Sequence, residues 1–155
     1  MVGIFNINGQ RIEIEFGSDE KLLDVLRKAG FKEIKSGCKT GNCGSCVVLL
    51  DGKPVNSCQV YAGSVIEKEI LTIKGLGTIH NPHPIQTAFV DAGAVQCGFC
   101  TPGMVLSTYA LLKKYPRPTE EQIKEGLDGN LCRCTGYVKI VDAVKLSAER
   151  VGKEG

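Results

Sequence analysis

Eight cysteines in two groups of four constrain this chain more than any other feature of its sequence. The groups are Cys38, Cys43, Cys46 and Cys58, and then Cys97, Cys100, Cys132 and Cys134. Four disulfides would suit a short secreted domain, but the first residues, MVGIFNINGQ, lack the charged head and apolar middle of a signal peptide. We therefore expect a cytoplasmic protein, in which reducing conditions keep thiols free. Closely grouped free thiols are prone to oxidation unless a metal binds them, so the pattern favours metal ligation.

The charge pattern argues against two other classes of protein. The chain has 19 Lys and Arg residues against 17 Asp and Glu, and the lysines are scattered rather than arranged in a stripe. We expect no nucleic-acid partner, because such surfaces concentrate positive charge. No apolar run approaches the roughly 20 residues that span a bilayer, so we also expect no membrane association.

Two hairpins are predicted in the first half of the chain. Apolar residues alternate on both sides of Asn8-Gly9, a dipeptide that favours a tight hairpin turn. A second hairpin is predicted around Asp51-Gly52, with its returning strand over residues 54–60.

One helix completes this half. Ser18 is placed as its N-cap and Gly30 just past its end, and a last strand is predicted over residues 70–73. A helix that covers one face of a sheet gives a compact α+β domain, which we assign to residues 1–76.

Residues 77–155 have a helical pattern instead. Three predicted helix starts carry a capping residue or a proline; they lie at Pro84, at Thr101-Pro102, and at Thr119 with Gln122 in capping-box spacing. A stripe of apolar residues with helical period over residues 140–151 predicts a fourth helix. Four helices predict an all-α bundle domain.

The first four cysteines have the spacing of a plant-type [2Fe–2S] ferredoxin. Three lie in the loop SGCKTGNCGSC, in the order C-x4-C-x2-C, and Cys58 follows at a distance. A bound cluster is anionic, so backbone N–H groups must approach its sulfurs closely, and the glycines of this loop permit that approach. The alternative is a zinc ion held by four cysteines, although zinc sites usually use two closely spaced pairs.

The second four cysteines form a C-x2-C pair and a C-x-C pair. On spacing alone a zinc site is a serious alternative here, although C-x-C is tighter than the usual zinc pair. Both pairs are predicted at helix junctions, where free N–H groups and the positive end of the helix dipole favour an anionic cluster.

Together the stretches GCKTGNCGSC, NSC, AVQCGFCTPGM and GNLCRCTGY resemble the iron–sulfur subunit of the molybdenum hydroxylases, the family of xanthine dehydrogenase, aldehyde oxidoreductase and carbon monoxide dehydrogenase. The resemblance covers essentially the whole chain. It implies a β-grasp ferredoxin-like domain followed by a four-helix bundle, each with one [2Fe–2S] cluster.

The resemblance also implies roles for individual residues. The four cysteines of the first group would bind the cluster nearer a flavin, and the four of the second group the cluster nearer molybdenum. Gln96, which precedes Cys97, would approach the molybdopterin cofactor, and Cys134 would contact the pterin amine. Without the resemblance Gln96 is an ordinary solvated amide. Arg133 is as compatible with a surface position as with a role in offsetting cluster charge.

The partners implied by the resemblance are a molybdopterin-binding large subunit and an FAD-binding medium subunit, assembled as a dimer of heterotrimers. We expect these to be separate chains, with no catalytic residue on this one. His80 and His83 flank Asn81-Pro82 in a predicted linker and are expected at the surface.

The resemblance leaves the substrate open, because relatives process purines, other N-heterocycles, aldehydes, carbon monoxide and aromatic acyl-CoA. We expect xanthine or another N-heterocycle. Two other classes also stay open: a free-standing two-cluster ferredoxin and a zinc-bound structural module.

Overall fold

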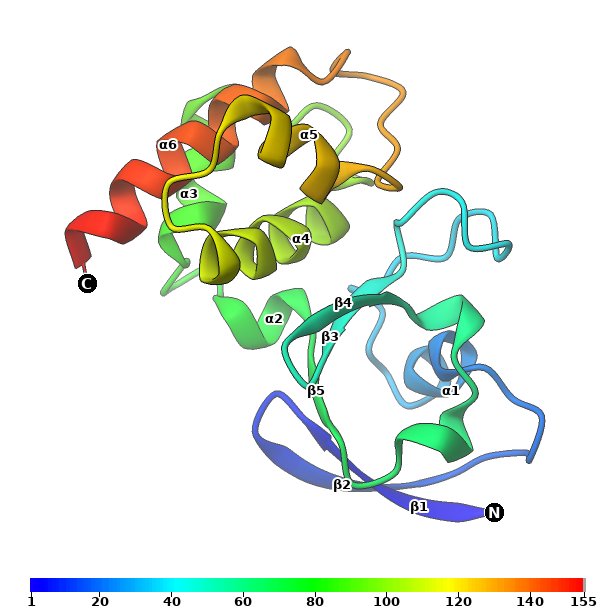
Figure 1. Ribbon diagram of the computed structural model, residues 1–155. Coiled ribbons are helices and arrows are strands. Elements are labelled where there is room, and N and C mark those ends of the chain that lie inside the picture. The colour runs from blue at the N-terminus through cyan, green and yellow to red at the C-terminus, as the bar shows by residue number, and fades with distance from the viewer. Residues whose placement is uncertain (155) are drawn as a thin grey trace.

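Five strands form one mixed sheet, and the chain then continues as a group of helices (Figure 1). The computed structural model describes residues 1–154. The strands are β1 (Val2–Ile7), β2 (Gln10–Glu15), β3 (Val47–Leu50), β4 (Lys53–Asn56) and β5 (Glu69–Leu71), in the order β2-β1-β5-β3-β4. β1 and β5 are parallel, and the other neighbours are antiparallel. The predicted α+β character is confirmed.

Both predicted hairpins are present, and each turns on a dipeptide with positive φ. The φ angles are 53° at Asn8 and 78° at Gly9, and 49° at Asp51 and 81° at Gly52. Positive φ at both central residues matches the right-handed twist of the flanking strands, and asparagine, aspartate and glycine tolerate it best.

The strand predicted over residues 54–60 is shorter in the structure. β4 ends at Asn56, and a 3-10 turn over Ser57–Gln59 follows. The hydroxyl of buried Ser57 donates a 2.7 Å hydrogen bond to the carbonyl oxygen of Cys46, which stabilises this turn. The alternating pattern of the sequence does not reveal such a local side-chain bond.

Helix α1 (Leu22–Lys28) packs on the sheet but begins later than predicted. Its N-cap is Lys21, not Ser18, and no side chain caps this end. The N–H of Gly17 instead donates a 2.7 Å hydrogen bond to the Glu20 carboxylate, so this segment forms its own turn before the helix.

The later helices are α2 (Ile73–Leu76), α3 (Pro84–Asp91), α4 (Thr101–Lys114), α5 (Glu120–Leu127) and α6 (Val138–Glu154). Pro84 is at the first turn of α3, and Thr119 and Gln122 form the predicted capping box of α5. α3 packs against α6, and α4 packs against α5 and also against β3. No helix within residues 1–154 is long and apolar enough to cross a membrane.

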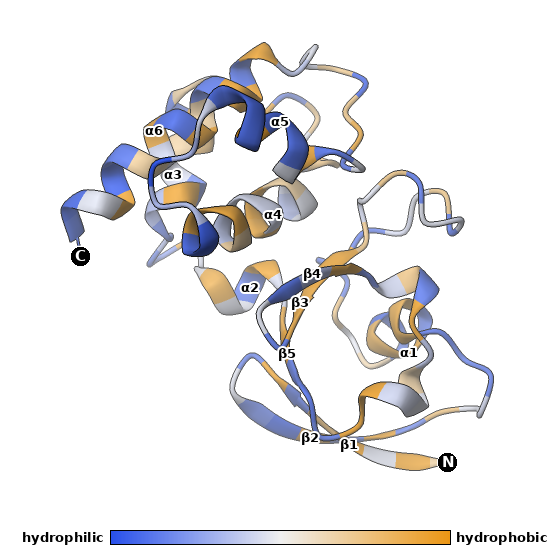
Figure 2. Ribbon diagram, viewed as in Figure 1, coloured by the Kyte–Doolittle hydropathy of each residue, from blue (hydrophilic) through white to orange (hydrophobic). Residues whose placement is uncertain are grey.

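β3 is buried on both faces, and this joins the two halves of the molecule. Val48 lies in the core formed by the sheet and α1. Val47 and Leu49, on the opposite face, form a separate small core with Leu106 of α4. Figure 2 shows the resulting apolar ribbon of β3, in contrast to α5, which is largely hydrophilic. The helices have a core of their own, built around Phe89, Met104 and other buried apolar side chains.

Candidate metal centres

The loop between α1 and β3 surrounds the first two cysteine sulfurs with backbone N–H groups. The Cys38 sulfur accepts hydrogen bonds from the N–H of Thr40 at 3.4 Å and of Cys43 at 3.3 Å. The Cys43 sulfur accepts one from the N–H of Cys38 at 3.4 Å. The Thr40 side chain and the N–H groups of Thr40, Cys43 and Asn42 lower the pKa of the Cys38 thiol to about 5. The loop therefore favours a thiolate, the form that binds metal.

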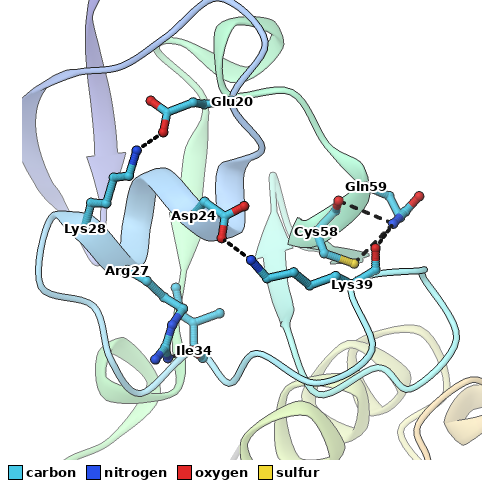
Figure 3. Close-up of polar contacts among 8 residues, drawn as sticks. All are labelled: Glu20, Asp24, Arg27, Lys28, Ile34, Lys39, Cys58 and Gln59. Carbon is cyan, nitrogen blue, oxygen red and sulfur yellow. Dashed lines mark hydrogen bonds and ion pairs between the residues drawn. The ribbon is translucent and has the colours of Figure 1, made fainter.

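The other two cysteines of this set are buried. Cys46 lies in the turn just before β3 and Cys58 in the 3-10 turn after β4, with exposed fractions of 3% and 5%. Burial, together with the adjacent Cys58 thiol, raises the pKa of Cys46 to about 11. Gln59 connects this pair to the loop, because its Nε2 donates to the Cys58 sulfur at 3.3 Å and to the carbonyl oxygen of Lys39 at 3.2 Å (Figure 3).

Two ion pairs and two hydrogen bonds hold α1 against the chain segments around it. Figure 3 shows Lys39 of the cysteine loop paired with Asp24 of α1, and Lys28 paired with Glu20. Arg27 donates hydrogen bonds to the carbonyl oxygens of Ile34 and Lys32, in the segment that leads into the loop. These contacts fix the loop to α1 without placing a charged side chain among the sulfurs.

One glycine of this loop is required by close approach. A Cβ at Gly37 would lie 2.7 Å from the Cys43 sulfur and 2.6 Å from the Ser45 hydroxyl. Only a residue without a side chain lets the backbone pass so near the sulfur. The observation agrees with the predicted reason for glycine in this loop.

The second set comes from two loops next to helix ends. Cys97 and Cys100 lie between α3 and α4, and Cys132 and Cys134 lie between α5 and α6. Cys100 interacts with Cys132, and Cys97 with Cys134, so the two loops meet pair to pair. Cys100 is itself the N-cap residue of α4, where Thr101 was predicted, so its thiol lies at the positive end of that helix.

The pKa values of two thiols in the second set shift in opposite directions. Burial raises the pKa of Cys100 to about 12. Burial also raises the pKa of Cys132, but hydrogen bonds from Thr135, Cys134 and Cys100 together outweigh it, so that the pKa falls below its usual value. The Thr135 hydroxyl lies 3.1 Å and its N–H 3.4 Å from the Cys132 sulfur.

The donor sets fit an iron–sulfur cluster. Within residues 1–154, no three His, Cys, Asp or Glu side chains converge closely enough to hold a single metal ion. A tetrahedral zinc ion needs sulfurs about 2.3 Å from one point, whereas a [2Fe–2S] cluster divides four thiolates between two irons. Free thiols, several of them beside N–H or O–H donors, are the kind of ligand and charge compensation that a cluster requires.

The remaining candidate residues lie outside these contacts. Gln96 and Arg133 are exposed beside the second set. His80 is exposed as predicted, but His83 is not simply a surface residue. It is half-buried, and its Nδ1 accepts a 3.2 Å hydrogen bond from the N–H of Ile85, so that it caps α3.

Sequence reasoning did not identify Gln59 and Thr135 as residues of the sites. Each follows a proposed ligand by one residue, in SCQ and RCT, and each carries a side-chain donor. That adjacency is a signal by which the sequence could have identified them, since a donor next to a ligand is well placed to reach a sulfur.

Comparison with known proteins separates the same two halves. The family described as "2Fe-2S iron-sulfur cluster binding domain" matches residues 5–70, and the family described as "[2Fe-2S] binding domain" matches residues 72–145.

Similarity to whole proteins extends over nearly the full chain. The chain is 47% identical to the nicotinate dehydrogenase small FeS subunit of Eubacterium barkeri, over 94% of this chain and 93% of that protein. It is 43% identical to the xanthine dehydrogenase iron-sulfur-binding subunit of Escherichia coli O157:H7, over 89% and 88%. Among solved structures, a chain of quinoline 2-oxidoreductase from Pseudomonas putida 86 superposes with a TM-score of 0.93 at 36% identity, covering 99% of this chain and 96% of that one.

Proposed function

This chain belongs to the iron–sulfur, electron-transfer subunits of the molybdenum hydroxylases, and on that premise we propose which residues bind its two [2Fe–2S] clusters. One cluster is bound by Cys38, Cys43, Cys46 and Cys58, within a β-grasp domain of residues 1–76. The other is bound by Cys97, Cys100, Cys132 and Cys134, within a four-helix bundle of residues 77–155. The observation that supports the assignment is that each half holds four free cysteines that lie in contacting pairs: Cys38 with Cys43 and Cys46 with Cys58, then Cys97 with Cys134 and Cys100 with Cys132.

Exposure around the second set supports the proposed order of the two centres. Cys97 and Cys134 are exposed, and large apolar side chains near them are exposed too: Val95 (36%), Phe99 (46%), Leu131 (56%), Tyr137 (40%) and Val138 (68%). A concentration of exposed apolar side chains marks a surface that another protein covers. We propose that the molybdopterin-binding large subunit covers this face, so that electrons enter there and leave through the first cluster to FAD on the medium subunit.

Gln96 and Cys134 lie at this face, and we assign them to the molybdopterin side. Both are exposed in the chain alone, so their polar atoms are free to meet a cofactor carried by a partner. In the complex the chain supplies no catalytic residue. The clusters supply one-electron chemistry, while the protein sets their surroundings.

The substrate of the complex is proposed to be an N-heterocycle. Three relatives are named for nicotinate, xanthine and quinoline, and each of these compounds has a ring nitrogen. The similarity to these relatives extends over nearly the whole chain. We also propose a cytoplasmic dimer of heterotrimers, in which the eight thiols meet iron under reducing conditions.

The first test is elemental analysis of the native complex isolated through this chain. About four irons per copy, as two [2Fe–2S] clusters require, are expected together with close to one molybdenum. Four irons with no molybdenum and no partner would instead identify a free-standing two-cluster ferredoxin. A colourless protein with zinc would contradict both cluster assignments.

A second test concerns Gln96. Gln96→Ala is expected to weaken docking of the molybdopterin subunit or to slow turnover, while both clusters assemble. Gln10→Ala, at an exposed position on β2, is the matched control and should change neither. An unchanged complex with unchanged turnover in Gln96→Ala would return Gln96 to an ordinary surface amide.

A further inference from the structure

A backbone hydrogen bond connects the two cysteine sets directly. The N–H of Leu131 donates to the carbonyl oxygen of Cys43 at 2.9 Å. Cys43 belongs to the first set, and Leu131 is bonded to Cys132 of the second. The sulfurs of Cys43 and Cys132 are therefore connected through covalent bonds and this single hydrogen bond.

Two glycines let the backbones come into direct contact at the same place. A Cβ at Gly103, in the first turn of α4, would lie 2.4 Å from the carbonyl oxygen of Gly44. A Cβ at Gly44 would lie 2.3 Å from the carbonyl oxygen of Gly129. In both cases the obstacle is backbone, which cannot move aside as a flexible side chain can. The first loop, the start of α4 and the loop before Cys132 therefore approach to the limit that their atoms allow.

Asn130 fills the space between these segments. Its side chain is buried, and its Nδ2 donates to the Ser107 hydroxyl of α4 at 3.0 Å. Its Oδ1 lies 2.9 Å and 3.2 Å from the Cβ positions that alanine would have at Gly44 and Gly103. That oxygen has no hydrogen-bond partner among residues 1–154. A buried acceptor without a partner lowers the stability of the folded state, so the amide is held there against a free-energy cost.

We propose that Gly44, Gly103 and Asn130 are positioning residues, which fix the separation of the two clusters at the Leu131–Cys43 hydrogen bond. The inference rests on the proposed function, since it takes both cysteine sets as ligands. In each transfer the chain conducts one electron from one centre, which is oxidised, to the other, which is reduced, and no atom moves with it. Because transfer between two bound clusters would slow steeply as they separate, backbone contact without intervening side chains would favour it.

The test uses Gly103→Ala in the intact complex. The added methyl group must push α4 and the first loop apart, so we expect weaker magnetic coupling between the two reduced clusters and a severalfold slower exchange of electrons between them. Gly126→Ala is the matched control, because its Cβ would meet Leu111 side-chain atoms at 2.9 Å and 3.1 Å inside the helical half, away from the junction. It should lower thermal stability while leaving the coupling unchanged. Iron content is measured in both variants.

A milder pair of variants decides the matter if Gly103→Ala does not assemble. Ser107→Ala removes the partner of Asn130, whereas Ser147→Ala removes an equally buried hydroxyl on α6 that bonds only within its own helix. Weaker coupling in Ser107→Ala but not in Ser147→Ala supports the proposal.

The outcomes distinguish failure of the positioning role from failure of the ligand assignment. Unchanged coupling in a junction variant that holds both clusters would overturn the positioning role and leave the ligand assignment intact. A wild-type complex without four irons per copy would instead overturn the ligand assignment on which this inference depends.

Discussion

The two halves of the molecule build the same kind of donor set by different means. In the β-rich half, three cysteines share one loop, and backbone N–H groups bond to the sulfurs of Cys38 and Cys43. In the helical half, the four cysteines come from two loops at helix ends, and a side-chain hydroxyl, that of Thr135, bonds to Cys132. The comparison teaches that four thiols of suitable geometry do not require one local structure.

The halves also differ in which cysteines reach the surface. The first set has one exposed cysteine, Cys38, whereas the second has two, Cys97 and Cys134. Exposure and hydrogen bonds to sulfur both influence the reduction potential of a cluster. The two centres of one chain are therefore expected to have different reduction potentials.

The largest expected effect that separates the halves is loss of a single cluster. Cys43→Ser should remove the first cluster and Cys100→Ser the second, so that iron falls from about four to about two per copy in each variant. In Cys43→Ser, flavin reduction should be blocked while substrate still reduces molybdenum. Rapid-mixing spectroscopy of the complex measures both steps. Normal flavin reduction in Cys43→Ser would contradict the assigned route.

Removal of one buried aromatic side chain from each core tests how independently the halves unfold. Phe5 and Phe89 are both almost completely buried, in the sheet core and the helical core respectively. Phe5→Ala and Phe89→Ala should each lower the free energy of unfolding by about 3–5 kcal/mol. Hydrogen exchange followed residue by residue locates the loss. Confinement of the loss to the mutated half would show separate unfolding, whereas a loss in both halves would show that the small core around Leu106 couples them.

Thiol reactivity sharpens the comparison in the chain freed of iron. The pKa of Cys38 is lowered to about 5, so this thiol is largely thiolate at neutral pH. The pKa of Cys100 is raised to about 12, so this thiol is almost entirely protonated. Iodoacetamide should therefore modify Cys38 well before Cys100, as peptide mass spectrometry can follow. The Cys38 rate should fall only as the pH drops through about 5, while the Cys100 rate should still rise in alkali. Equal rates at neutral pH would show that the loop N–H groups do not stabilise the thiolate.

The smallest expected effect concerns the two surface ion pairs of Glu120, which lie within the helical half. Lys145 and Lys124 hold the pKa of Glu120 at about 2, below its usual 4.5. The stability from this depressed pKa is present above pH 4.5 and is lost as the pH falls toward 2. Glu120→Gln should therefore lower the melting temperature slightly at neutral pH and have no effect near pH 2. Glu121→Gln is the control, and an equal shift in both variants would remove the ion pairs as the cause.

The sequence predicted features that depend on a few neighbouring residues. The turns at Asn8-Gly9 and Asp51-Gly52 and the capping box at Thr119 need only their own side chains, and all are present. The start of α1 at Ser18 was wrong, because Glu20 uses its carboxylate to close a turn before the helix.

In the candidate sites too, features set by neighbouring residues were predicted and contacts between distant residues were not. Cysteine spacing separates the two groups of thiols, because the first group has three cysteines in one loop and the second has two closely spaced pairs. The contact of Leu131 with Cys43 joins residues far apart in the chain, and no local pattern encodes it. The same holds for Asn130, whose position depends on glycines from two other segments.

Leu106 has a consequence for how such a protein can change over generations. It lies on α4 but is buried with Val47 and Leu49 of β3, so each half supplies part of the other's interior. A ferredoxin module transplanted from this chain would carry a bare hydrophobic strand face, and the helical module a bare leucine. The two modules are therefore expected to be inherited, fused and exchanged as one unit, even where the surrounding subunits are rearranged.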